Sequence, residues 1–193
     1  GVKGITDFTV VRGDIPVVSV DAYYMINEKT GYIRVKNFGE QTYAEMLVAL
    51  AELNIEGMEG LVVDLRGNTG GYMHIAIQMA NEFLPKDRLI VYTEGRKSPR
   101  EEFNSDGRGT FQTLPLVVLV DEASASSSEI FAGAIQDNDR GTIVGRRTFG
   151  KGLVQQPVEF RDGSVVRLTI ARYYTPSGRC IQKPYTKGHD EEY

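Results

Sequence analysis

The stretch that decides the fold is GLVVDLRGNTGG, residues 60–71. Its first half, Gly60 to Leu65, is a short apolar run of the kind found in strands buried on both faces. Its second half, Arg66 to Gly71, is a glycine-rich turn, and an apolar pattern with helical spacing follows from about Tyr72 to Leu84. A buried strand that leads through a tight turn into a helix is typical of an α/β fold.

The sequence on either side continues this alternation. A helix is expected from Thr42 to about Asn54, opened by a capping box in which Thr42 precedes Glu45 by three residues. A second helix is expected through Ile130 and Ile135, after the strongest buried strand of the chain, Leu116–Val120. Further strands are expected over residues 8–11, 17–24, 32–38, 89–93 and 142–144.

Two later segments complete the expected architecture. The polar stretch Glu94–Thr113 is expected to be a long exposed loop. Strands over 158–160 and 164–170 flank Asp162-Gly163, which favours a tight hairpin turn. We therefore expect one α/β domain over residues 1–193, with a mixed sheet and late β-hairpins. We also expect a lead-in strand within about 1–18 and a frayed tail over 186–193.

Composition narrows the function classes. The chain has 193 residues, of which 41% are hydrophobic and 25% charged, as in ordinary globular domains. The net charge of −4 argues against non-specific nucleic-acid binding, which needs a basic surface. A single cysteine excludes an internal disulfide and a multi-cysteine zinc site, and two histidines exclude a histidine-rich metal centre. No apolar stretch is as long as a membrane span.

The segment DEASASSSE, residues 121–129, is the first candidate for chemistry. The plainer interpretation is structural, because Ser126 and Glu129 have the spacing of a capping box at a tight strand-to-helix turn. The alternative is a serine nucleophile at a helix N-terminus, where free amides and the helix dipole stabilise an oxyanion. The segment is not Gly-x-Ser-x-Gly, so an α/β-hydrolase elbow is not supported.

A serine nucleophile needs a base. His189 lies in the polar tail and His74 at the start of a helix, so a histidine base has thin support. Lys151 lies between two glycines in the apolar stretch RTFGKGLVQ, which can draw its side chain inward, although taken alone the plainer interpretation is a lysine in a turn. Burial favours the neutral amine that a lysine base requires. The glycine-rich turn after Asp64 lacks the GK[ST] of a phosphate loop but suits an amide donor for an oxyanion.

Taken together and in this order, three segments closely resemble the C-terminal processing (tail-specific) serine peptidases. They are DLRGNTGGY from Asp64, VLVDEASASSSEIFAGAIQDND from Val118 and GRRTFGKGLVQ from Gly145. The resemblance extends from about Ser19 to Tyr185. It implies a β/α spiral related to the crotonase and Clp protease folds. It also implies endoproteolysis of chains with accessible, often apolar, C-termini, without a metal or a cofactor.

The resemblance assigns the catalytic residues. The family's nucleophile matches the middle serine of Ser-Ala-Ser, which is Ser126. The family's general base matches Lys151, and the number of residues between the two is the same as in the family. The glutamine that helps to orient the lysine matches Gln155.

The resemblance also assigns residues around these three. Asp137, Glu129 and Thr148 match positions that support the site, and we interpret Asp137 as a structural or charge-supporting residue, not a base. The oxyanion donors are expected to be the amide of Ser127 and an amide of Gly70 or Gly71. The family usually has alanine where this chain has Ser127, but a backbone donor does not depend on its side chain.

The family usually places a PDZ module before this core, and no PDZ-like stretch is present. We therefore expect this chain to be an excised core of a longer protein. Its partners are expected to be protein or peptide substrates with exposed C-termini, and oligomer formation is left open. Resemblance to bacterial members implies a periplasmic or cell-envelope location.

Two other function classes stay open. Crotonase relatives use the same spiral and paired amides on acyl-CoA thioesters, but they do not need Lys151, and no evident CoA-phosphate cluster is present. Retinoid-binding relatives bind lipids without cleavage, and the intact Ser126, Lys151 and Gln155 argue against that function.

Overall fold

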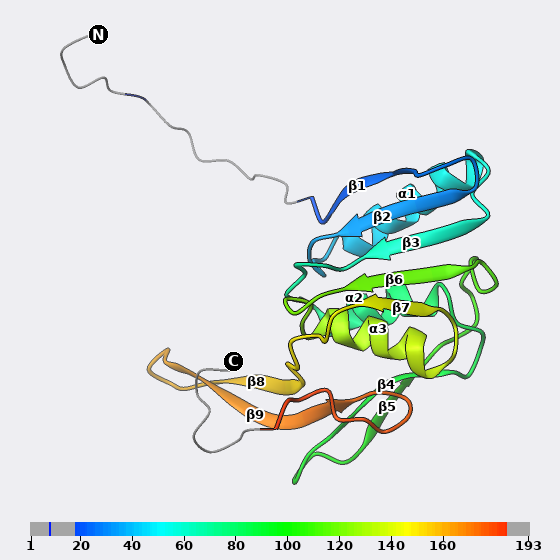
Figure 1. Cartoon of the computed structure of the whole chain (residues 1–193). Helices are drawn as coiled ribbons and strands as arrows, with labels where there is room; N and C mark the ends of the chain where they lie inside the picture. The colour runs from blue at the N-terminus through cyan, green and yellow to red at the C-terminus, as the bar shows by residue number, and fades with distance from the viewer. Residues whose placement is uncertain (1–7, 9–17, 185–193) are drawn as a thin grey trace.

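The computed structural model describes residue 8 and residues 18–184. Of the expected lead-in strand over about 1–18, only Phe8 and Val18 are among these residues, and the tail over 186–193 lies outside them. Figure 1 shows two sheets with helices packed between and beside them.

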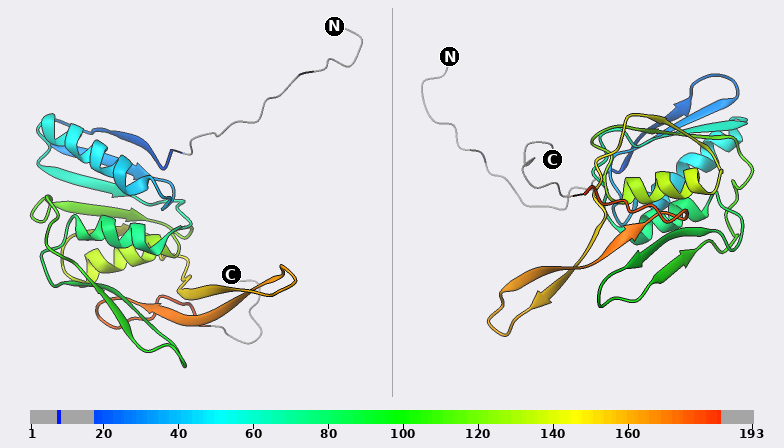
Figure 2. Two further views of the ribbon diagram at one scale, coloured as in Figure 1. Left: turned by 180° about the vertical axis from the view of Figure 1, so that it is seen from behind. Right: turned by 60° about the horizontal axis from the view of Figure 1, so that its bottom comes forward.

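The larger sheet has the order β1-β2-β3-β6-β7. It consists of β1 (Val20–Met25), β2 (Thr30–Val35), β3 (Gly60–Asp64), β6 (Leu116–Val120) and β7 (Thr142–Gly145). β1 pairs antiparallel with β2, and all later pairs are parallel, which confirms the expected mixed sheet. The parallel strands follow one another in chain order. Right-handed crossovers therefore place the helices on one face, as both views in Figure 2 show.

The three helices are α1 (Thr42–Ile55), α2 (Met73–Asn81) and α3 (Ser127–Asp137). The capping box expected at the start of α1 is wrong, because the N-cap residue is Gln41 and makes no side-chain cap. Thr42 instead accepts a hydrogen bond from the Gly39 N–H at 2.8 Å. The carboxylate of Glu45 accepts the N–H groups of Ser19 and Val20, both at 2.8 Å. A tertiary contact to the start of β1 has taken the place of the local cap.

The smaller sheet is antiparallel, in the order β5-β4-β9-β8. It consists of β4 (Leu89–Glu94), β5 (Glu101–Asn104), β8 (Leu153–Glu159) and β9 (Val165–Tyr174). Strand β5 corrects the expectation of a loop over the whole of Glu94–Thr113. Its sequence, EEFN, has no strong strand signal, and pairing with β4 determines its structure. The expected hairpin at Asp162-Gly163 is confirmed, with Gly163 at φ 83°.

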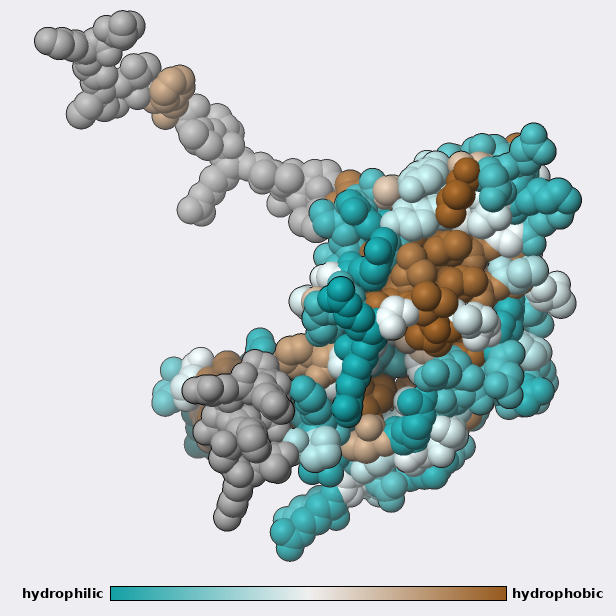
Figure 3. All heavy atoms as spheres, viewed as in Figure 1, coloured by the Kyte–Doolittle hydropathy of each residue, from teal (hydrophilic) through white to brown (hydrophobic). Residues whose placement is uncertain are grey.

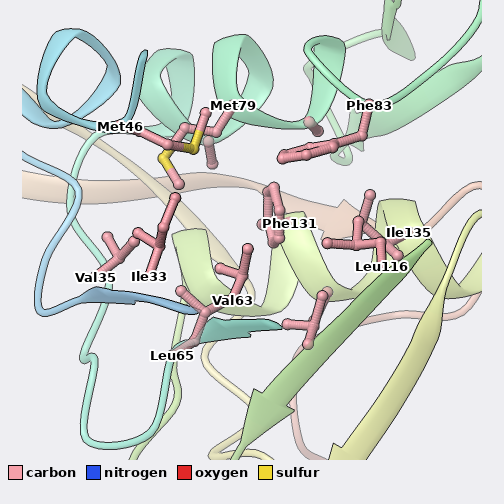
Figure 4. Close-up of a cluster of buried hydrophobic side chains, with 14 of the residues drawn as sticks. Ile33, Val35, Met46, Val63, Leu65, Met79, Phe83, Leu116, Phe131 and Ile135 are labelled. Atoms are coloured by element: carbon pink, nitrogen blue, oxygen red, sulfur yellow. The ribbon is translucent and has the colours of Figure 1, made fainter. Parts of the chain in front are cut away.

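The hydrophobic core lies between the larger sheet and the helices (Figure 4). Phe83 and Phe131 meet edge to face, with ring centroids 6.1 Å apart. Alternate side chains of β3 and β6 point away from this core, and Val62, Val117 and Leu119 among them are half-buried. Figure 3 shows hydrophobic side chains gathered over the middle of this open face.

Candidate active site

The site forms where two neighbouring parallel strands end. β3 and β6 pair in parallel, so the turns that follow them emerge at the same edge of the sheet. The Gly67 N–H donates to both carboxylate oxygens of Asp121, at 3.0 and 3.1 Å. The Ala125 N–H donates to the carbonyl of Asn68 at 3.0 Å. These bonds hold the glycine-rich turn against the serine-rich turn, although more than fifty residues separate them in sequence.

Ser126 has an uncommon backbone conformation, with φ 56° and ψ −112°, immediately before the first turn of α3. A non-glycine residue in such a region costs about 1–3 kcal/mol, and it persists only where its surroundings enforce it. Gly70 is part of that enforcement. A Cβ there would lie 2.8 Å from the Ser126 Cβ and 2.7 Å from the Ala125 carbonyl oxygen. Only glycine allows this approach, and Gly70 itself has φ 100°.

Glu129 joins the serine segment to the lysine segment. Its carboxylate is 6% exposed and accepts three backbone N–H groups. Oε2 accepts from Ser126 at 2.8 Å and from Lys151 at 2.9 Å, and Oε1 accepts from Gly150 at 2.7 Å. One carboxylate oxygen thus bridges the backbone nitrogens of Ser126 and Lys151, which are separated by no more than two hydrogen-bond lengths.

The Lys151 side chain is exposed, which fits the plainer interpretation of a surface lysine and not a side chain drawn inward. Gly152 next to it is buried, and the Tyr173 N–H donates to the Gly152 carbonyl at 2.8 Å. The flanking glycines therefore serve close backbone packing, and they leave the lysine side chain toward solvent.

Two backbone N–H groups beside Ser126 have no acceptor within the described part of the chain: those of Ser127 and Gly71. Ser127 is the first residue of α3, where N–H groups have no partner within the helix. Gly70 does not share this property, because its N–H donates to Asn68 Oδ1 at 2.8 Å. Of the two glycines expected as oxyanion donors, only Gly71 therefore has an unengaged N–H.

Asn68 and Asp121 organise the site and were not singled out from the sequence. Asn68 is fully buried, and its side chain donates to the Val35 carbonyl and accepts the Gly70 N–H, both at 2.8 Å. Asp121 lies at the end of β6 and accepts N–H groups from both turns. Asp121 comes directly after the buried strand β6, and Asn68 lies in the glycine-rich turn that follows β3. Short polar side chains at such positions favour local backbone capping, and this was their signal in the sequence.

The other expected residues lie farther out. Asp137 ends α3, about 16 Å along the axis from Ser126, and it binds Ser177 and Arg179. The Gln155 side chain is exposed and makes no hydrogen bond to the described residues. Thr148 lines a cavity of about 210 Å³ next to Glu129.

His74 is 56% exposed on its side chain and lies 3.9 Å from the Glu40 carboxylate. Its partners are thus Glu40 and the Tyr72 ring, whose centroid lies 5.4 Å from its own. His189 falls outside the described residues.

Within residues 18–184, no group of three or more His, Cys, Asp or Glu side chains could hold a metal ion. None of the helices in this range is long and apolar enough to cross a membrane.

Comparison with known proteins identifies the family of the chain. The profile of peptidase family S41 matches residues 29–190. A carboxyl-terminal-processing protease of Synechocystis sp. is 44% identical over 156 residues, covering 81% of this chain and 36% of that protein. The carboxy-terminal processing protease CtpA of Bacillus subtilis is 37% identical over 180 residues, covering 93% of this chain and 38% of that protein.

A solved structure gives the same result. A photosystem II D1 C-terminal processing protease superposes with a TM-score of 0.75 at 40% identity, covering 79% of this chain and 39% of that one. The fold is thus that of an S41 peptidase core. The chain belongs to peptidase family S41. It spans well under half the length of these relatives.

Proposed function

We propose that this chain is the catalytic core of a serine endopeptidase in which Ser126 is the nucleophile and Lys151 the general base. The observation that carries the proposal is the strained Ser126 backbone, held by the same Glu129 oxygen that accepts the Lys151 N–H. Ser126 and Glu129 form the capping box expected from the sequence. A cap does not require a strained backbone, however, so strain maintained at one serine at a helix N-terminus favours a functional role in addition to capping.

The reaction follows from these roles. Neutral Lys151 takes the proton from Ser126 Oγ, which attacks a backbone carbonyl of the substrate. The N–H groups of Ser127 and Gly71 stabilise the resulting oxyanion. The C–N bond breaks, Lys151 returns the proton to the leaving amine, and an acyl-enzyme remains. Lys151 then activates the water that hydrolyses the ester.

The exposed position of Lys151 indicates what the substrate must contribute. A bound peptide that covers the lysine would desolvate it and favour its neutral form. Strand β8 begins two residues after Lys151 and is one of the two edge strands of its sheet. An extended substrate would add to that edge through backbone hydrogen bonds, which tolerate varied sequences. The neighbouring strand over Arg167–Tyr174, by contrast, is paired with β8 and, at its end, with β4.

The resemblance and the family suggest the wider setting. We propose protein substrates cut near accessible, apolar C-termini, with no metal or cofactor. Gln155 would orient Lys151 once substrate is bound, and Thr148 and Asp137 would support the surrounding structure. A periplasmic or envelope location and assembly through segments outside this chain belong to the same proposal.

The test is cleavage of an unfolded protein with an apolar C-terminal tail, followed by mass spectrometry from pH 6 to 9. Wild-type chain, Ser126→Ala and Lys151→Ala are compared, with Lys29→Ala as a control. Lys29 is an exposed lysine paired only with Glu59. Cleavage that rises with pH and is lost in the first two variants supports the proposal. Full activity of Lys151→Ala refutes the dyad, and ligand binding without cleavage favours a binding module.

A further inference from the structure

We propose that the Ser127 hydroxyl is a positioning group for the oxyanion hole: it ties the two peptide donors to each other. Its Oγ donates to the Gly71 carbonyl at 2.9 Å. This inference rests on the proposed function, since Ser127 and Gly71 carry the two N–H groups assigned to the oxyanion. It concerns a side chain, whereas that assignment concerns only backbone atoms.

The surroundings show that this bond joins the two donor residues directly. Ser127 is 1% exposed, so its hydroxyl is shielded from bulk water, whereas Gly71 lies at the surface. Gly71 is held on its other side by Phe38, because a Cβ at Gly71 would lie 2.3 Å from the Phe38 carbonyl oxygen. Phe38 and Gly71 also form an isolated parallel bridge. Gly71 is therefore held between Phe38, which lies three residues after the end of β2, and Ser127, the first residue of α3.

The family's usual alanine at this position would lack the bond. Gly71 and Ser127 each have a free N–H, and the spacing of these two groups determines how well both reach one oxygen atom. A hydroxyl that joins the same two residues restricts that spacing before substrate binds. Interactions that pre-organise donors for the transition state raise kcat and leave KM nearly unchanged.

Ser128 provides a matched control. It is the next residue of the same helical turn, it is fully buried, and its Oγ donates to the Asn68 carbonyl at 2.9 Å. Ser128→Ala therefore removes a bond of equal length between the same two segments, but not one to a donor residue. Ser126→Ala serves as the test of the nucleophile itself.

The experiment measures kcat and KM for the peptide substrate, together with the labelling rate by an alkyl fluorophosphonate. In that reaction the Ser126 oxygen bonds to phosphorus, and fluoride and the serine proton leave. We expect Ser127→Ala to lower kcat and the labelling rate about tenfold and to change KM by less than about twofold. Ser128→Ala is expected to stay within about twofold of wild type in all three.

The outcomes separate the two proposals. If Ser126→Ala keeps labelling or cleavage, the proposed function is refuted, and this inference fails with it. The same holds if wild type shows neither. Wild-type rates in Ser127→Ala, or an equal loss in Ser128→Ala, overturn the inference alone. Amide exchange of residues 70–72 gives a readout independent of catalysis, and it must be faster in Ser127→Ala than in Ser128→Ala.

Discussion

Replacing Glu129 by glutamine tests whether one buried carboxylate assembles the site. The substitution keeps the length and shape of the side chain and removes its charge. Glutamine has one acceptor oxygen and one donor NH2 group, whereas the structure presents three N–H donors to the two carboxylate oxygens. Whichever way the amide turns, its NH2 group faces at least one backbone N–H.

The magnitude follows from these bonds. A hydrogen bond to a charged group contributes about 1.5–3 kcal/mol, and a neutral one about half of that. Glu129→Gln loses at least one charged bond and weakens the others, so the free energy of unfolding should fall by about 2–4 kcal/mol. This is a large part of the roughly 5–15 kcal/mol that stabilises a domain. Cleavage should fall as well, because the Ser126 and Lys151 backbones lose their shared acceptor.

The assay is urea unfolding followed by circular dichroism at pH 7, with Glu122→Gln as the control. Glu122 lies in the turn that leads into α3, but its side chain is 65% exposed and pairs with an exposed Arg146 at 3.0 Å. Such a pair contributes about 0–1 kcal/mol. A Glu129→Gln protein as stable as the control, with wild-type cleavage, would refute the reasoning.

The remaining predictions concern backbone strain and titration. Gly70→Ala should destabilise by at least about 1 kcal/mol more than Gly67→Ala and abolish cleavage. Both glycines have positive φ, but a Cβ at Gly67 meets nothing within 4 Å. Equal denaturation midpoints would contradict this.

Burial alone would raise the pKa of Asp137, but hydrogen bonds from Ser177 and Thr175 and the Arg179 pair outweigh it and lower that pKa below the usual 3.8. Its stabilisation is therefore present above about pH 4 and lost as pH falls through the lowered value. The free energy of unfolding should therefore fall more steeply with decreasing pH in wild type than in Asp137→Asn. Identical acid-unfolding profiles of the two proteins would contradict this prediction. Burial and the hydrogen bond to Asp64 raise the pKa of Tyr32 to about 12. Tyr32→Phe should therefore remove tyrosinate absorbance only near pH 12, and a loss near pH 10 would contradict the assignment.

The sequence was sufficient for the features that depend on local pattern. The apolar runs over Leu116–Val120 and Gly60–Leu65 predicted β6 and β3, because short apolar runs of this kind are typical of buried strands. Burial on both faces is not what the structure shows, since the side chains that point away from the core are only half-buried. Asp162-Gly163 predicted the hairpin turn for a similarly local reason. Ser126 and Lys151 were identified from their motifs, and these remain predictions until the variants are measured.

Tertiary structure decided what local pattern could not. Thr42 and Glu45 have the spacing of a capping box, but Glu45 accepts the N–H groups of Ser19 and Val20 instead. Capping rules based on local sequence do not include such distant competing donors. Residues 101–104 form a strand only because β4 offers an open edge.

The site shows the same division between sequence and fold. The sequence by itself determined which residue types are present at the serine-rich and glycine-rich turns. Only the fold decided that the Gly70 N–H is already bonded to Asn68, that Gly71 is the free donor and that the Lys151 side chain lies toward solvent. The physical reason is that hydrogen-bond partners and burial depend on residues distant in sequence, whereas periodicity and turn chemistry depend on near neighbours.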